Sequence, residues 1–231
     1  MTGGGAIPKG GRLGGLSALV TQADAFMGPA VTNLFRAEGA EVVADCRDLR
    51  EISAAQTLVE EAGHIDILVA NLMFRNTRTP AHETSDEDWA RMFDVMVHPL
   101  HRLIRAVLPQ MLARGRGKIV VMGSANGLRG TSIRSAYSAA RGAQLSYVRS
   151  VGVEVAPAGV CVNAIAQNFV SNPTSYPAEV TGAPEFQARL AEVPIGRIAR
   201  GEESAALALF LAGPESDFMV GQVISFAGGW A

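Results

Sequence analysis

Short apolar segments alternate with longer helix-forming segments from Leu16 to the end of the chain, and this alternation constrains the fold more than any other feature. Several of the apolar segments are almost continuously hydrophobic, as strands buried on both faces of a parallel sheet are. Such an order favours parallel strands joined by crossover helices. We expect strands at Ser17–Thr21, Glu41–Asp45, Ile65–Asn71, Lys118–Gly123, Val160–Ile165 and Val223–Phe226, and helices at Gly28–Glu38, Arg50–Ala62, Asp86–Leu112, Ser135–Val155 and Glu202–Leu211.

These elements predict an α/β protein with a single-domain, doubly wound, Rossmann-like parallel sheet that has helices on both faces. The 231 residues are enough for one substantial core. We expect a flexible amino-terminal leader over residues 1–15 and one catalytic domain over residues 16–231, because no repeat or low-complexity linker divides the rest. In the predicted long helix, Ser85 is a plausible N-cap and Pro99 should cause a kink or a break.

Charge and cysteine content exclude several function classes. A net charge of −2 without clustered Lys and Arg predicts binding to neither nucleic acid nor an anionic membrane. There is neither a run of about 18 apolar residues for a membrane span nor a signal-peptide core. Cys46 and Cys161 adjoin apolar segments and match no metal motif, so we expect buried, reduced thiols, no bound metal and a cytoplasmic protein.

The segment from Ile119 to Leu145 carries the strongest chemical signal. Ser124 follows an apolar run and is expected at the carboxyl end of a strand, where open parallel sheets bind ligands. Tyr137 and Arg141 are four residues apart in a predicted helix, so their side chains share one face. We therefore expect a hydroxyl, a phenol and a fixed cation to converge.

The arginine determines what this trio can do. A phenol titrates near pH ~10 and burial raises its pKa further, so unaided it is a poor base. A cation ~4 Å away at an effective dielectric of ~20 contributes about 4 kcal/mol, or roughly three pKa units in favour of the phenolate. We interpret Tyr137 as a general base and Ser124 as the holder of the substrate oxygen. An ordinary surface pair on a helix is the alternative.

The turn after the first strand, Thr21 to Gly28, normally holds a dinucleotide pyrophosphate in this fold and needs glycines to do so. Here only Gly28 remains, and the ring of Phe26 would fill the space. Asp45 could serve as an acidic ribose ligand, but with the turn blocked we give it a structural role. We predict Phe26 as a pocket wall, with plain core packing as the alternative.

The segment after the fifth strand, Ala166 to Pro177, is rich in turn formers and contains Phe169 and Tyr176. Its backbone N–H groups could form a small anion nest, and the positive ring edges of both aromatics and of Phe26 could hold a soft anion. A specificity loop without anion binding is equally compatible with these residues.

The predicted architecture, Ser124, the basic residue four positions after Tyr137 and the closing VISFAGG from Val223 resemble the short-chain dehydrogenase/reductase superfamily. Classical members have a glycine-rich first turn, Asn-Asn-Ala-Gly after the third strand, a helix asparagine in the proton relay and a lysine after the tyrosine. This chain departs from them at each of these places. It has Gln22 and Phe26 for two glycines, Asn71-Leu72-Met73-Phe74, Met96 for the asparagine and Arg141 for the lysine.

These departures resemble the halohydrin dehalogenases in two motifs, Thr21-x4-Phe26-x-Gly28 and Ser124-x12-Tyr137-x3-Arg141. The resemblance implies that Ser124, Tyr137 and Arg141 form the catalytic triad. It implies a homotetramer, a dimer of dimers, in which Trp230 reaches a neighbouring subunit. It further implies a halide site in place of a nicotinamide site, formed by Phe26, Gln167, Asn168, Phe169, Val170 and Tyr176.

The function implied by this resemblance is dehalogenation of vicinal haloalcohols to epoxides with no cofactor, and the reverse ring opening of epoxides by small anions such as azide, cyanide or nitrite. The expected partners are a haloalcohol or epoxide and a halide or other small anion. Two alternatives stay open, namely an atypical NAD(P)-dependent short-chain reductase and a non-catalytic ligand-binding relative.

Overall fold

A computed structural model describes residues 10–74 and 78–231 and contains one parallel sheet of six strands in the order β2-β1-β3-β4-β5-β6. All its pairings are parallel, and the order reverses between β1 and β3, as in a doubly wound sheet. The predicted fold class is therefore confirmed. The strands are β1 (Ser17–Val20), β2 (Glu41–Ala44), β3 (Ile67–Ala70), β4 (Gly117–Ser124), β5 (Val160–Gln167) and β6 (Val223–Phe226).

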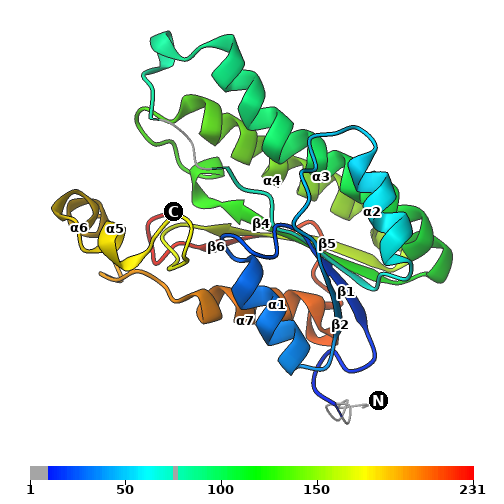
Figure 1. Cartoon of the computed structure of the whole chain (residues 1–231). Helices are drawn as coiled ribbons and strands as arrows, with labels where there is room; N and C mark the ends of the chain where they lie inside the picture. The colour runs from blue at the N-terminus through cyan, green and yellow to red at the C-terminus, as the bar shows by residue number, and fades with distance from the viewer. Residues whose placement is uncertain (1–9, 75–77) are drawn as a thin grey trace.

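Helices cover both faces of the sheet, with α2, α3 and α4 on one face and α1 and α7 on the other (Figure 1). The helices are α1 (Gly28–Ala37), α2 (Ala54–Ala62), α3 (Asp86–Arg114), α4 (Ser135–Val155), α5 (Ala178–Thr181), α6 (Pro184–Leu190) and α7 (Gly201–Ala212). Short 3-10 turns occupy Ala81–Glu83, Ala125–Gly127, Ala156–Ala158 and Pro214–Ser216. The sequence did not predict α5 and α6, which are too short to show a helical period. None of the described helices is long and apolar enough to cross a membrane.

Each face of the sheet has its own hydrophobic core, because the central strands alternate their side chains between the two layers. On β4, for example, Ile119 and Val121 pack on the α3 and α4 side, whereas Val120 and Met122 pack on the α1 and α7 side. The β2 segment is one of the predicted apolar segments, but it is not buried on both faces. That strand lies at the sheet edge, so its valines are only partly covered.

The helix α3 begins where the sequence predicts, because the Ser85 side chain accepts a hydrogen bond of 3.1 Å from the backbone N–H of Asp88. Of the two outcomes expected at Pro99, the break is wrong, since the helix continues past this residue and past Pro109, and the kink stays a prediction. The apolar face of α3, which includes the fully buried Leu103, packs into the core. Most helical stability in proteins comes from such packing, which here outweighs the backbone hydrogen bonds that proline cannot form.

The two cysteines are free thiols, but only Cys161 is buried as expected. Cys46 is exposed, because the chain leaves the sheet edge after β2 and turns into solvent. The expected leader, residues 1–15, falls largely outside the described residues. Of its described part, Leu13 is fully buried and belongs to the core on the α1 side.

The Ser85 cap gives a test of the fold. We expect Ser85→Ala to lower stability by about 1 kcal/mol, because an orphan N–H at the start of α3 loses its acceptor. For a chain of this size that corresponds to a fall in Tm of roughly 2–4 °C, measured by calorimetry. Ser53→Ala is the matched control, since Ser53 also precedes a helix but makes no capping hydrogen bond. Equal losses in the two variants would contradict the assigned cap.

Candidate active site

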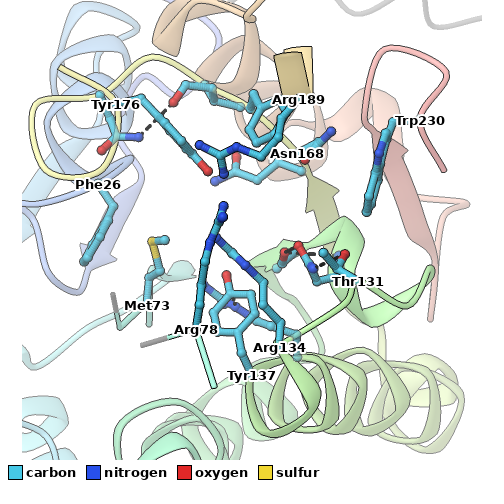
Figure 2. A pocket seen from close by; sticks show the side chains of 18 of the residues that line it. Phe26, Met73, Arg78, Thr131, Arg134, Tyr137, Asn168, Tyr176, Arg189 and Trp230 are labelled. Atoms are coloured by element: carbon cyan, nitrogen blue, oxygen red, sulfur yellow. Dashed lines mark hydrogen bonds between the residues drawn. The ribbon is translucent and has the colours of Figure 1, made fainter. Parts of the chain in front are cut away.

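A cavity of about 140 Å³ lies at the carboxyl ends of β4 and β5, beside the turn that follows β1 (Figure 2). This is the edge at which doubly wound sheets bind their ligands. All nine residues that the sequence proposed for the site line it. They are Phe26, Ser124, Tyr137, Arg141, Gln167, Asn168, Phe169, Val170 and Tyr176.

Ser124 is the last residue of β4 and is paired in register with Gln167 of β5. Its hydroxyl accepts a hydrogen bond of 3.2 Å from the backbone N–H of Asn126, in the 3-10 turn that follows the strand. The same side chain lies beside the Tyr137 phenol and helps to lower the pKa of that group. The strand end thus fixes a buried hydroxyl beside the phenol.

Tyr137 and Arg141 form a buried pair within α4, with only 5% and 2% of their surfaces exposed. The Arg141 Nε donates to the phenol oxygen at 3.1 Å. Its Nη1 donates to the Leu72 carbonyl at 2.9 Å and to the Gln144 side-chain oxygen at 2.8 Å. A third acceptor is the Met122 carbonyl at 3.2 Å. These bonds hold the guanidinium rigidly, so the alternative of an ordinary surface pair is wrong.

The surroundings of Tyr137 lower the pKa of its phenol. Burial is the largest single influence and raises the pKa of the phenol. The charge of Arg141, the hydrogen bonds from Ser124 and Arg141 and the charge of Arg134 together outweigh it, so the pKa lies below its ordinary value of 10.0. The two other tyrosines behave oppositely, because burial and a nearby negative group raise the pKa of both Tyr147 and Tyr176.

Aromatic rings and an amide line the opposite part of the cavity. The rings of Phe169 and Tyr176 meet edge to face at 5.6 Å between centroids, and both pack on Phe186 of α6. The side-chain Nδ2 of Asn168 is buried and has no hydrogen-bond partner among the described residues. A buried N–H donor without an acceptor is costly in a folded protein, so this atom is available to an anion.

Comparison with known proteins identifies the family. A family model described as enoyl-(acyl carrier protein) reductase matches residues 15–231. The chain belongs to the short-chain dehydrogenase/reductase superfamily.

Relatives within this superfamily carry different activities. The chain is 33% identical to a galactitol 2-dehydrogenase (L-tagatose-forming) of Cereibacter sphaeroides, over 92% of this chain and 84% of the relative. It is 28% identical to a 3-oxoacyl-[acyl-carrier-protein] reductase of Vibrio harveyi, over 94% and 98%. A solved structure described as a dehalogenation enzyme is 31% identical, with a TM-score of 0.89 over 95% of this chain and all of that chain.

The first turn does not fit the dinucleotide that the superfamily implies. Phe26 lies at a φ of 51°, its N–H donates to the Thr174 hydroxyl at 3.0 Å, and its ring lines the cavity. The Gln22 side chain is bound to the backbone of Met73 by two hydrogen bonds of 2.9 and 3.1 Å. The Asn71 amide closes the turn by donating to the Gln22 and Ala25 carbonyls, each at 3.0 Å.

This closed turn leaves the remaining glycine little room, since a Cβ at Gly28 would lie 2.1 Å from the Gln22 carbonyl oxygen. Asp45, the residue that could otherwise have bound a ribose, is engaged as well. The Asp45 carboxylate accepts from the Arg47 side chain at 2.6 Å and from its backbone N–H at 3.2 Å. The structural role that the sequence favoured for Asp45 therefore agrees with its contacts.

Several residues that line the pocket or hold Arg141 were not found from the sequence. Gln144 shares a helix face with Arg141 at a spacing of three, and that spacing could have revealed it. Arg78 and Arg189 come from a loop and from the short α6, where no local pattern marks them. Trp230 lines the pocket of its own chain, and its carbonyl accepts from Arg129 at 2.7 Å.

The tyrosine environments predict an ordered titration. The chain has three tyrosines, and we expect one phenol to ionise at lower pH than the other two. The ultraviolet absorbance of phenolate measures this titration. As pH rises, this first step should be absent in Tyr137→Phe and present in Tyr147→Phe. Loss of the first step in the Tyr147 variant instead would refute the assignment.

Proposed function

We propose that the protein is a cofactor-independent halohydrin dehalogenase, which converts vicinal haloalcohols to epoxides and releases halide. One observation carries the proposal: a phenol paired with a rigid guanidinium faces a cavity whose wall is the inward-folded Phe26 turn. That combination retains a base and removes the room for a dinucleotide. The likeness to the solved dehalogenation enzyme adds support.

The first step is proton removal. Ser124 holds the substrate hydroxyl oxygen at the strand end, and the phenolate of Tyr137 accepts its proton. Arg141 stabilises the phenolate but takes no part in proton transfer, because a guanidinium does not deprotonate in proteins. The substrate becomes an alkoxide, and the proton later passes from the phenol to water.

The second step is intramolecular displacement. The alkoxide oxygen attacks the neighbouring carbon from the side opposite the halogen, the new C–O bond closes the epoxide, and the halide leaves with the electron pair of the C–X bond. Positioning supplies much of the rate, since both reacting atoms belong to one molecule. The unpartnered amide of Asn168 and the ring edges of Phe26, Phe169 and Tyr176 are the proposed hosts of the halide.

The same site run in reverse would open epoxides with halide, azide, cyanide or nitrite.

The remaining residues assigned to the halide site are Gln167 and Val170. Gln167 is held in place because its side-chain oxygen accepts from the Ser204 hydroxyl at 2.8 Å. Assembly as a homotetramer stays a prediction.

An NAD(P)-dependent reductase is the second candidate, because the dehydrogenase and reductase relatives named above cover nearly the whole chain. The two candidates differ in a simple binding measurement. We expect a titration monitored by cofactor fluorescence to show no saturable binding of NADH or NADPH. The reason is that hydrogen bonds to Asn71, Met73 and Thr174 close the turn Thr21–Gly28. Saturable binding with reduction of a carbonyl substrate would favour the reductase. A protein that turns over neither haloalcohols nor carbonyl substrates would favour a non-catalytic relative.

The decisive variant is Tyr137→Phe, which removes the base and keeps the ring. We expect halide release from 1,3-dihalo-2-propanols to fall about 10²–10⁴-fold, measured without added cofactor. In the parent, activity should rise with pH as Tyr137 loses its proton. Tyr147→Phe is the matched control, since Tyr147 lies on the same helix and bonds His101 outside the cavity. Undiminished release in Tyr137→Phe would end the proposal.

A further inference from the structure

Three arginines that the proposed mechanism does not use point into the cavity from opposite walls (Figure 2). Arg78 follows β3 in the chain, Arg134 is the N-cap residue of α4, and Arg189 belongs to α6. The amino end of α4 adds the partial positive charge of a helix terminus to the same region. Together with Arg141, four guanidinium groups therefore line one small cavity.

No carboxylate balances these charges within the described residues. The ion pairs found there involve none of the four arginines. Glu192 is the sole acidic side chain that lines the described cavity, and it is exposed and unpaired with them. Like charges held close together without a counter-ion repel one another, so the cavity is preorganised for an anion.

Aromatic contacts hold two of the three guanidinium groups at defined places. The Arg134 guanidinium lies 5.8 Å from the centroid of the Tyr137 ring. The Arg189 guanidinium lies 5.8 Å from Phe169 and 5.4 Å from Phe186. The cationic cluster thus extends from the catalytic phenol to the aromatic loop, which is where the rest of a substrate would lie. Partial desolvation, then the charges of Arg189 and Arg134, lower the pKa of Arg78, in agreement with this crowding, although the Arg78 side chain is exposed.

We propose that the cavity takes haloalcohols and epoxides that carry an anionic group, and that Arg78, Arg134 and Arg189 bind that group. The inference rests on the proposed function for the reacting half of the molecule. Carboxylate is the best match, since guanidinium groups bind its two oxygens in a planar, bidentate manner. Phosphate offers the same anionic oxygens and is distinguished below.

Binding is tested first with compounds that contain no halogen. Calorimetry on the full-length protein should show 3-hydroxybutanoate binding about tenfold or more tightly than the near-isosteric 3-hydroxybutanamide, because hydrogen bonds between charged groups are stronger than those to a neutral amide. Glycerol phosphate serves as the phosphate arm. Tighter binding of the phosphate than of the carboxylate would overturn the choice of carboxylate.

Two variants test whether the cavity arginines bind the anionic group, and a third variant is the control for loss of a positive charge. Arg78→Gln and Arg189→Gln should each reduce the preference for carboxylate over amide several-fold. Arg36→Gln removes the same charge from the exposed end of α1, away from the cavity, and should leave the preference unchanged. Equal preferences in all four proteins, or no preference in the parent, would overturn the inference.

Turnover separates this inference from the proposed function. The ratio of kcat/KM for 4-chloro-3-hydroxybutanoate over its amide should follow the binding preference and fall in the Arg189 variant. Release of chloride from both compounds at equal kcat/KM would overturn the proposed anion site and leave the proposed dehalogenase function standing. Carboxylate-selective binding without any chloride release would support the anion site and overturn the dehalogenase function. Weaker bromide inhibition in the arginine variants with an unchanged ratio would assign the cluster to halide and overturn the inference.

Discussion

The hydrogen bond from the Arg141 guanidinium to the Tyr137 phenol is the interaction on which this site depends. Burial alone would make the phenol a weaker acid, and the adjacent charge, together with the hydrogen bonds and the Arg134 charge, reverses that tendency. The guanidinium is held by three further acceptors, the carbonyls of Leu72 and Met122 and the side chain of Gln144. These acceptors come from the segment after β3, from β4 and from α4. The charge is therefore placed by the packing of these elements and not by the helix alone.

The fold brings the rest of the chemistry to this pair. Ser124 and Asn168 stand at or just beyond the ends of the neighbouring strands β4 and β5, and the turn after β1 reaches the same edge because β1 and β4 both pair with β3. Segments far apart in sequence thus form a single cavity. A parallel sheet aligns the carboxyl ends of its strands, so polar residues placed there converge without further design.

Replacement of glycines in one turn changes what the common superfamily fold can hold. Gln22 and Phe26 both adopt positive backbone φ values, which residues other than glycine rarely do. Hydrogen bonds to Thr174, Met73 and Asn71 over-determine this conformation. Strain compensated in this way is frequent at functional sites. Here it accompanies a turn that is closed by contacts with other segments, where classical members of the superfamily have glycines.

The amino-acid sequence, with the family resemblance that its motifs carry, determined the fold class, most element boundaries and nine of the residues that line the cavity, because hydrophobic periodicity and motif spacing are local properties. It could not determine that α3 continues past Pro99, that Cys46 is exposed, or that α5 and α6 form. Nor could it place Arg78, Arg134 and Arg189 around one cavity. Those features depend on contacts between distant segments, and only the tertiary structure decides which side chains meet and whether a charge finds a partner.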